Sequence, residues 1–160
     1  MSDPAGEIHV REATVVDTLA LVRFNECLAL ETENVRLDRA KVVAGVRAVL
    51  DDRHKGTYLV AERGGTVIGG LLITYEWSDW RNATFIWIQS VYVEPSHRRQ
   101  GVFRRLFQAV LHIGESPAYC GVRLYMEDGN ANARAAYGRV GLGYRGYVVL
   151  EGGDAVREAH

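Results

Sequence analysis

Residues 91–103 read Val91-Tyr92-Val93-Glu94-Pro95-Ser96-His97-Arg98-Arg99-Gln100-Gly101-Val102-Phe103. A β-prone run stops at Pro95, because proline has no backbone N–H for a strand ladder, and Gly101 precedes a run with helical periodicity. The first N–H groups of a helix have no intrahelical partner, and the helix dipole makes that end positive. Arg98 and Arg99 add charge beside these groups. The stretch therefore predicts a strand, an anion-binding loop and a helix.

The residues around this stretch predict two successive strand–helix pairs. A long strand over residues 84–93 leads into the loop, and a second strand over residues 121–127 precedes a helix capped by Asn130. The apolar face of the first helix comprises Val102, Phe103, Leu106, Phe107, Val110 and Leu111. The inward residues of the second helix are Ala133, Ala136, Tyr137 and Val140. Gly141 then fits the position just after its last turn.

The rest of the chain predicts further strands and two more helices. Strands are expected over residues 7–11, 57–62, 66–75 and 144–150. The glycines in Arg63-Gly64-Gly65 supply the positive φ angles of a tight hairpin turn. Two helices are expected between the first two of these strands, one ending near residues 31–34 and one capped by Asp38.

Length and composition bound the class of protein. A chain of 160 residues, 48% apolar and 24% charged, fits one globular domain over residues 1–160. A net charge of -1 argues against nucleic acid as a partner. Cys27 and Cys120 lie far apart, and no Cys or His spacing suggests a disulfide or a metal site. Without an apolar run of about 18 residues or a signal-peptide core, we expect no membrane partner and a cytoplasmic location.

Two separated motifs carry a resemblance to a known family. Residues 98–103, and Asn130, Ala133, Tyr137 and Gly141 at their spacing, resemble the GCN5-related N-acetyltransferase (GNAT) superfamily. The resemblance implies an α/β (α+β) fold with a mixed, mostly antiparallel, splayed sheet of six to seven strands flanked by four helices. It also implies an acetyl-CoA-dependent N-acetyltransferase that acts on an amine, without a metal.

The same resemblance assigns residues to the acyl donor. The amides of Gln100, Gly101, Val102 and Phe103, with Arg98 and Arg99, would meet the pyrophosphate of CoA, and Val91, Tyr92 and Val93 would offer backbone groups to its pantetheine arm. Asn130, and less directly Asn132, would also reach the CoA. Tyr137 would also contact the CoA and would be the general acid that protonates the departing thiolate, although its spacing alone favours a core aromatic.

A general base is harder to assign from the sequence. Gln89 occupies the strand position at which many relatives carry glutamate, and an amide cannot accept a proton at neutral pH. Another strand position used by relatives is Tyr125 in this chain. Glu127 lies two residues further on, so strand alternation would place both side chains on one face. Glu127 is the candidate base, directly or through water; a solvated strand end is the alternative.

The acceptor side has the least specific signals. Glu31 and Glu33 lie between the first two expected helices and would attract a cationic amine. The family resemblance places Gln89 on the acceptor side as well. Trp77 and Trp80 would form an aromatic wall beside the acceptor, or they would pack in a homodimer interface. We expect a small primary amine as acceptor. A protein N-terminus or a lysine is an alternative acceptor, and a non-catalytic acyl-CoA-binding module is an alternative of another class.

Overall fold

The computed structural model describes residues 6–153. The chain forms two compact units, which meet in sequence between Tyr125 and Met126. The first unit holds a sheet and three helices, and the second holds one helix and the extended chain that follows it. The single domain expected from chain length stays a prediction, so the two units are described separately.

The first unit is built on one sheet with strand order β1-β2-β3-β4-β5. The strands are β1 (His9–Glu12), β2 (Thr57–Arg63), β3 (Thr66–Ser78), β4 (Ala83–Val93) and β5 (Tyr119–Leu124). The first three pairings are antiparallel, and β4 and β5 are parallel. A parallel pair requires a crossover, and the helix that follows β4 supplies it. The mixed, mostly antiparallel α/β sheet predicted from the sequence is confirmed.

The predicted count of six to seven strands is wrong for the part of the chain that the structure describes, which contains five. The missing element is the strand expected over residues 144–150, which the structure shows as exposed, irregular chain. Its β-prone side chains have no sheet to pack on, since Tyr144 is 81% exposed and Leu150 is 90% exposed. β-propensity expresses packing against neighbouring strands and does not hold a strand by itself.

Residues 6–153 contain four α-helices, which is the predicted number, and the first three belong to the first unit. They are α1 (Thr18–Glu33), α2 (Arg39–Asp51), α3 (Val102–Ile113) and α4 (Ala131–Arg139). As predicted, Asp38 caps α2 by accepting hydrogen bonds from the amides of Ala40 and Lys41. No helix within residues 6–153 has the length and apolar character needed to cross a membrane.

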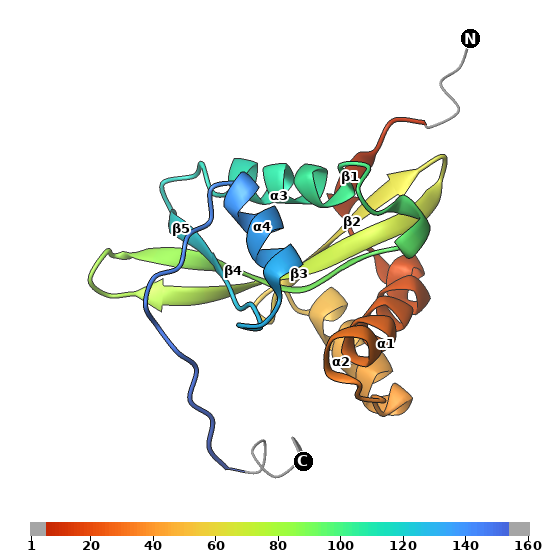
Figure 1. Cartoon of the computed structure of the whole chain (residues 1–160), viewed down its shortest axis with the longest axis horizontal. Helices are drawn as coiled ribbons and strands as arrows, with labels where there is room; N and C mark the ends of the chain where they lie inside the picture. Colours follow the sequence, from red (N-terminus) through yellow and green to blue (C-terminus); the bar gives the residue numbers. More distant parts are fainter. Residues whose placement is uncertain (1–5, 154–160) are drawn as a thin grey trace. The chain divides into compact units, whose positions relative to one another are not determined.

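The sheet of the first unit is covered on both faces. Figure 1 shows α3 along one face and α1 with α2 against the other. The buried residues of α3 are Val102, Leu106, Phe107 and Val110, on the periodic face that the sequence predicts. The core on the other face consists of Leu21, Val22, Phe24, Val46, Tyr58, Val60 and Tyr92. Each such side chain contributes about 1.5–3 kcal/mol by leaving water, so α1 and the end of β4 are held firmly together.

A β-bulge interrupts β4 near its end. Leu72 of β3 pairs with Gln89, but Gly70, two residues earlier, pairs with Tyr92, three residues later. The extra residue lies in β4, where Ser90 has a φ of 51°. A bulge of this kind leaves a residue outside the ladder and increases the local twist. The last residues of β4 are therefore turned relative to the rest of the strand.

The second unit contains α4, and both ends of this helix match the sequence signals. The Asn130 side chain accepts a hydrogen bond from the amide of Ala133. At the other end, Gly141 has a φ of 88°, its amide donates to the Gly138 carbonyl, and the Leu142 amide donates to Tyr137. These two bonds form a Schellman motif, which satisfies the last carbonyls of the helix.

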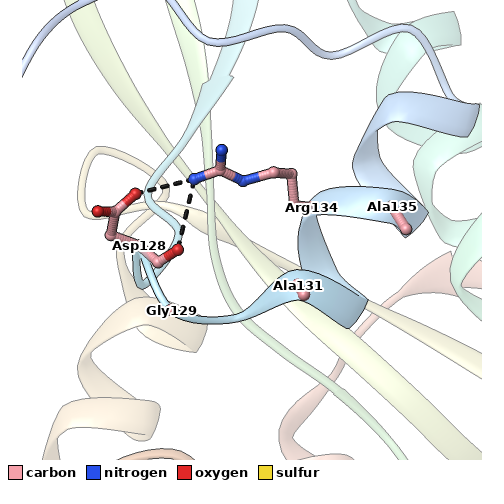
Figure 2. A pocket seen from close by; sticks show the side chains of 5 residues that line it. All are labelled: Asp128, Gly129, Ala131, Arg134 and Ala135. Atoms are coloured by element: carbon pink, nitrogen blue, oxygen red, sulfur yellow. Dashed lines mark hydrogen bonds and ion pairs between the residues drawn. The ribbon is translucent and has the colours of Figure 1, made fainter.

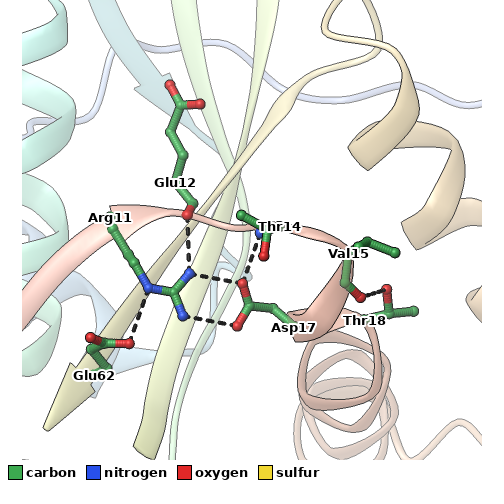
Figure 3. Close-up of polar contacts among 7 residues, drawn as sticks. All are labelled: Arg11, Glu12, Thr14, Val15, Asp17, Thr18 and Glu62. Carbon is green, nitrogen blue, oxygen red and sulfur yellow. Dashed lines mark hydrogen bonds and ion pairs between the residues drawn. The ribbon is translucent and has the colours of Figure 1, made fainter. Parts of the chain in front are cut away.

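A buried ion pair fixes the entry of the chain into α1. Figure 3 shows the Arg11 guanidinium donating hydrogen bonds to both carboxylate oxygens of Asp17, at 2.8 and 3.0 Å, while its Nε donates to Glu62. Asp17 is 4% exposed and also accepts a hydrogen bond from the Thr14 amide. The Arg11 guanidinium therefore ties β1 to β2 through Glu62 and to the turn before α1 through Asp17.

Asp17→Asn is expected to lower the free energy of unfolding by about 2 kcal/mol at pH 7, because Arg11 loses a buried, bidentate partner. The hydrogen bonds from Arg11 hold the pKa of Asp17 below its ordinary 3.8. Since the folded state then binds this proton less tightly than the unfolded chain, the stabilisation is complete above about pH 5 and is lost as pH falls through 3.8 and below.

Urea unfolding at pH 7 and at pH 3 measures this dependence. The gap between wild type and Asp17→Asn should narrow at the lower pH. Glu115→Gln, which removes an exposed contact with His112, should stay within about 0.5 kcal/mol of wild type at pH 7. An equal gap at both pH values would show that the Asp17 charge is not the source of the stabilisation.

Candidate functional site

The loop between β4 and α3 has an unusual backbone. After a short 3-10 turn, η2 (Pro95–His97), Arg99 has a φ of 62° and Gly101 has a φ of 83°. A left-handed conformation costs a non-glycine residue about 1–2 kcal/mol, and such strain concentrates at binding sites. Turns with left-handed residues form concave nests of backbone N–H groups that bind anions. The geometry supports the anion-binding loop that the sequence predicts here.

The surroundings of Gly101 fit a ligand that approaches the backbone. A Cβ atom built on Gly101 would meet no protein atom within 4 Å. The first turn of α3 contains no acidic residue, so nothing there repels an anion. The residues present therefore fit the phosphates of CoA at this helix N-terminus.

Side chains from elsewhere in the first unit hold this loop in shape. Gln100 donates from Nε2 to the Ser96 carbonyl at 2.9 Å, and its Oε1 accepts from Arg63 Nη1 at 2.7 Å. Arg63 belongs to the β2–β3 hairpin and also donates to the Gly6 carbonyl. Sequence analysis does not link Arg63 to the loop, because no local pattern joins residues 37 positions apart.

The two arginines of the loop have different roles in the structure. Arg98 donates from Nε to the Val93 carbonyl at 2.9 Å and from Nη2 to Glu31 at 2.8 Å. Arg99 is exposed and, like Arg104 and Arg105 on α3, makes no ion pair or side-chain hydrogen bond within residues 6–153. The sequence assigns both Arg98 and Arg99 to an anion; the geometry leaves Arg99 available and engages Arg98 within the protein.

The same contacts place Glu31, one of the two acids expected on the acceptor side. Its carboxylate accepts from Arg98 and from the Tyr92 hydroxyl, the latter at 3.2 Å. Glu33, by contrast, is exposed near the end of α1. The structure therefore brings Glu31, Tyr92 and Arg98 together and leaves Glu33 apart from them.

The pairing register separates the residues predicted for the acceptor. Leu72 pairs with Gln89 and Trp77 pairs with Thr84, so Gln89 and Trp77 point to opposite faces of the sheet. Trp80 lies beyond the end of β3 and is 91% exposed. Gln89 and Trp77 therefore cannot line one wall together, because the register of β3 on β4 places them on opposite faces.

The face that carries Gln89 has its own polar and aromatic contacts. Gln89 donates to the Thr74 hydroxyl at 2.6 Å, and Glu76 pairs with Arg123 at 2.7 Å. Trp87 and Tyr125 pack with their ring centroids 4.4 Å apart. No local pattern predicts that Thr74, Glu76 and Arg123 lie on this face together, because their proximity depends on the register of three strands.

The catalytic residues suggested by the sequence belong to the second unit. Burial raises the pKa of the Tyr137 hydroxyl above its ordinary value, so this group keeps its proton at neutral pH. Glu127 is exposed, and its carbonyl accepts from the Asn130 amide. The strand expected to extend to Glu127 ends at Leu124, so strand alternation does not set the direction of this side chain. Asn132 is exposed on the first turn of α4.

The second unit also has a shallow hollow at the start of α4. It is lined by Asp128, Gly129, Ala131, Arg134 and Ala135. Figure 2 shows the Arg134 guanidinium reaching back to the Asp128 carboxylate at 2.8 Å and to its carbonyl. This contact braces the turn that carries Asn130. Residues 6–153 contain no cluster of three or more His, Cys, Asp or Glu side chains arranged to hold a metal.

The bulged strand, the left-handed loop and the arginines without acidic partners at a helix start are typical of a protein that binds a phosphate-bearing ligand. The chain belongs to the acetyltransferase (GNAT) family, whose model matches residues 23–143. It is therefore an acetyl-CoA-dependent acetyltransferase, which confirms the resemblance seen in the sequence. Among curated proteins, none is significantly similar to this chain.

Solved structures support this assignment. A possible acetyltransferase from Clostridium difficile 630 is 41% identical, with a TM-score of 0.86 over 91% of this chain and 97% of that chain. An aminoglycoside N-acetyltransferase, AAC(6')-Iy, solved with CoA, is 15% identical (TM-score 0.78, covering 94% and 98%). A ribosomal-protein-alanine N-acetyltransferase from Brucella melitensis biovar Abortus 2308 is 16% identical (TM-score 0.72, covering 91% and 100%). The last two share the fold alone.

Gly101→Glu is expected to weaken acetyl-CoA binding at least about tenfold, because a carboxylate would repel the phosphates and fill their approach to the backbone. Isothermal titration calorimetry measures the affinity. Gly65→Glu is the matched control, since Gly65 has a φ of 79° and equally open surroundings in the β2–β3 turn. Similar melting temperatures with binding lost only in Gly101→Glu would confirm the loop; normal binding by Gly101→Glu would remove it from the site.

Proposed function

We propose that this protein transfers the acetyl group of acetyl-CoA to the primary amine of a small molecule, by direct attack of the amine on the thioester. The observation that carries the proposal is the continuity of the site in the first unit. The bulge at Ser90, the strand end at Val91 to Val93 and the left-handed loop at Gly101 follow one another within twelve residues, from 90 to 101.

The donor would lie along this run. The amides of residues 100–103 and the Arg99 guanidinium would receive the pyrophosphate, where each charge-assisted hydrogen bond contributes about 1.5–3 kcal/mol. Backbone groups of Val91, Tyr92 and Val93 would receive the pantetheine arm. Asn130 and Asn132 retain their assignment from the family resemblance. Arg98 is best placed to support the loop rather than to bind phosphate, because its donors already meet Val93 and Glu31.

The chemistry requires stabilisation of an oxyanion and a proton for the leaving group. Backbone N–H groups near Val91, beside the bulge, are the candidates for the oxyanion, since a bulge frees a residue from the strand ladder. Tyr137 is the proposed general acid, because burial raises its pKa and its hydroxyl therefore carries a proton at neutral pH. Glu127 is the proposed base, directly or through water. Gln89 is not a base and would orient the acceptor, because its amide is fixed by Thr74.

Glu127 is an exposed candidate base with little support from its surroundings. The acceptor is therefore expected to be an amine that loses its proton easily. At pH 7 a lysine-like amine with a pKa of about 10.4 costs about 4.6 kcal/mol to deprotonate, whereas an amine with a pKa near 8 costs about 1.4 kcal/mol. Two acids of the first unit agree with this, since Glu76 is paired with Arg123 and Glu31 with Arg98. We therefore favour a small amine of low pKa over a polycation.

A cytoplasmic location and a homodimer are part of the proposal. Cys27 and Cys120 are free thiols, which fits a reducing compartment. Trp77 is 62% exposed and Trp80 is 91% exposed on the β3–β4 hairpin, and large exposed aromatic side chains are typical of protein interfaces. Neither property is needed for the chemistry above.

A thiol-release assay with acetyl-CoA and a panel of amines tests the function. The panel should contain small amines of pKa 7–10, polyamines, and peptides with a free N-terminus or a lysine. We expect turnover with members of the first group. Turnover with peptides alone would identify a protein acetyltransferase, and tight acetyl-CoA binding without turnover of any acceptor would identify a non-catalytic acyl-CoA-binding module.

Tyr137→Phe is expected to lower kcat by at most about 10²- to 10⁴-fold, the usual contribution of a general acid. Acetyl-CoA affinity should stay within about twofold, because binding relies on the loop of the first unit. Because the pKa of Tyr137 is raised, the wild-type rate should not decline through loss of this proton below about pH 10. Stopped-flow thiol release gives the rate; an unchanged kcat would exclude Tyr137 from the mechanism.

A further inference from the structure

A small polar cluster joins the last turns of α1 to the start of the anion-binding loop. Glu31 accepts from the Tyr92 hydroxyl with one carboxylate oxygen and from Arg98 with the other. The Arg98 guanidinium also lies 5.3 Å from the Tyr92 ring centroid and donates to the Val93 carbonyl. We call Glu31, Tyr92 and Arg98 the clasp. Its three members come from α1, from β4 and from the loop.

The clasp is well supported on its strand side. Tyr92 is 4% exposed, and its ring packs against Phe24 of α1 at 5.2 Å between centroids. The hydroxyl oxygen is therefore fixed in position, and burial, with smaller contributions from Cys27 and Glu31, raises the pKa of Tyr92, so the hydroxyl keeps its proton. A buried donor that points at a carboxylate places that carboxylate, which in turn places the Arg98 guanidinium.

A second ion pair joins the same two elements. Arg23, two turns earlier on α1, pairs with Glu94 at the end of β4. In the Arg23–Glu94 pair the cation lies on α1, whereas in the Arg98–Glu31 pair the cation lies on the loop. Because opposite charges alternate along this seam, sliding α1 against the loop would bring like charges together. The pairs therefore fix the register of α1 on residues 93–98.

We infer that Glu31 is a positioning residue that couples acyl-donor binding at the loop to the order of the exposed segment between α1 and α2. This inference rests on the proposed function, since it takes CoA to bind at the loop. Residues 34–37 begin three positions after Glu31, are all exposed, and connect the end of α1 to the Asp38 cap of α2. When phosphate oxygens hold the loop at Arg99 and Gly101, the clasp transmits that order to Glu31 and the segment beyond.

The alternative is that Glu31 competes with phosphate for Arg98. The two cases predict opposite changes in CoA affinity. If the clasp preorganises the loop, removing the Glu31 charge weakens CoA binding; if Glu31 competes for Arg98, removing it strengthens CoA binding. The three contacts of Arg98, to Glu31, Val93 and Tyr92, favour the first case, because a guanidinium shared among three groups of its own chain is costly to withdraw.

The test uses the full chain, with CoA as the probe. Glu31→Gln is expected to raise the Kd for CoA about threefold to tenfold, the range for losing a charge pair and a hydrogen bond near the surface. Glu31→Asp should recover part of the loss. Glu26→Gln is the matched control, because Glu26 lies on the same helix and pairs with Arg39 of α2 at 2.6 Å instead of with the loop; its Kd should be unchanged.

Hydrogen exchange supplies a readout that a purely structural role would not move. In wild type and in Glu26→Gln, CoA should slow amide exchange in residues 31–38, and in Glu31→Gln this effect should be lost while CoA still protects residues 98–103. An unchanged or lower Kd for Glu31→Gln, or equal protection of residues 31–38 in that variant, overturns the coupling alone. Absence of CoA binding by wild type overturns the proposed function and the coupling with it.

Discussion

The left-handed backbone at Arg99 and Gly101 is the constraint on which the rest of the site depends. It turns the chain from the end of β4 into α3, and α3 is the crossover that allows β5 to run parallel to β4. The strain at Arg99 is maintained because both sides of the loop are anchored, through Gln100 to Arg63 and through Arg98 to Glu31. A strained loop held by these contacts is preorganised for ligand binding.

The distribution of charge in the first unit follows from the same loop. Several acids on its helices and sheet are paired with arginines, as in Asp17 with Arg11 and Glu76 with Arg123. At the loop the balance changes, since Arg99 has no acidic partner among the described residues and the first turn of α3 has no acid. A chain with a net charge of -1 can thus present a local positive site, because where the charges lie matters more than their sum.

Much of the fold could be read from the sequence where the signal is local. The α3 face, the hairpin glycines, the Asp38 and Asn130 caps and the Gly141 terminus are each set by residues within a few positions of one another, and the structure shows them as expected. The strand expected at residues 144–150 is absent from the structure, because a strand exists only when another strand accepts its hydrogen bonds. Glu127 lies outside the sheet because β5 ends at Leu124. Hydrophobic periodicity does not show which residue of a strand is the last to be paired.

The sequence by itself determined the family and predicted the anion-binding loop with the residues that border it, because these depend on spacing along a short stretch of chain. Only the tertiary structure decided how those residues are used. Arg98 and Arg99 are identical neighbours in sequence, yet one is engaged by Glu31, 67 positions away, and the other remains available. Gln89 and Trp77 lie on opposite faces because of a strand register that no local pattern fixes. Contacts between distant residues depend on the packing of whole elements, and that packing is a property of the folded chain.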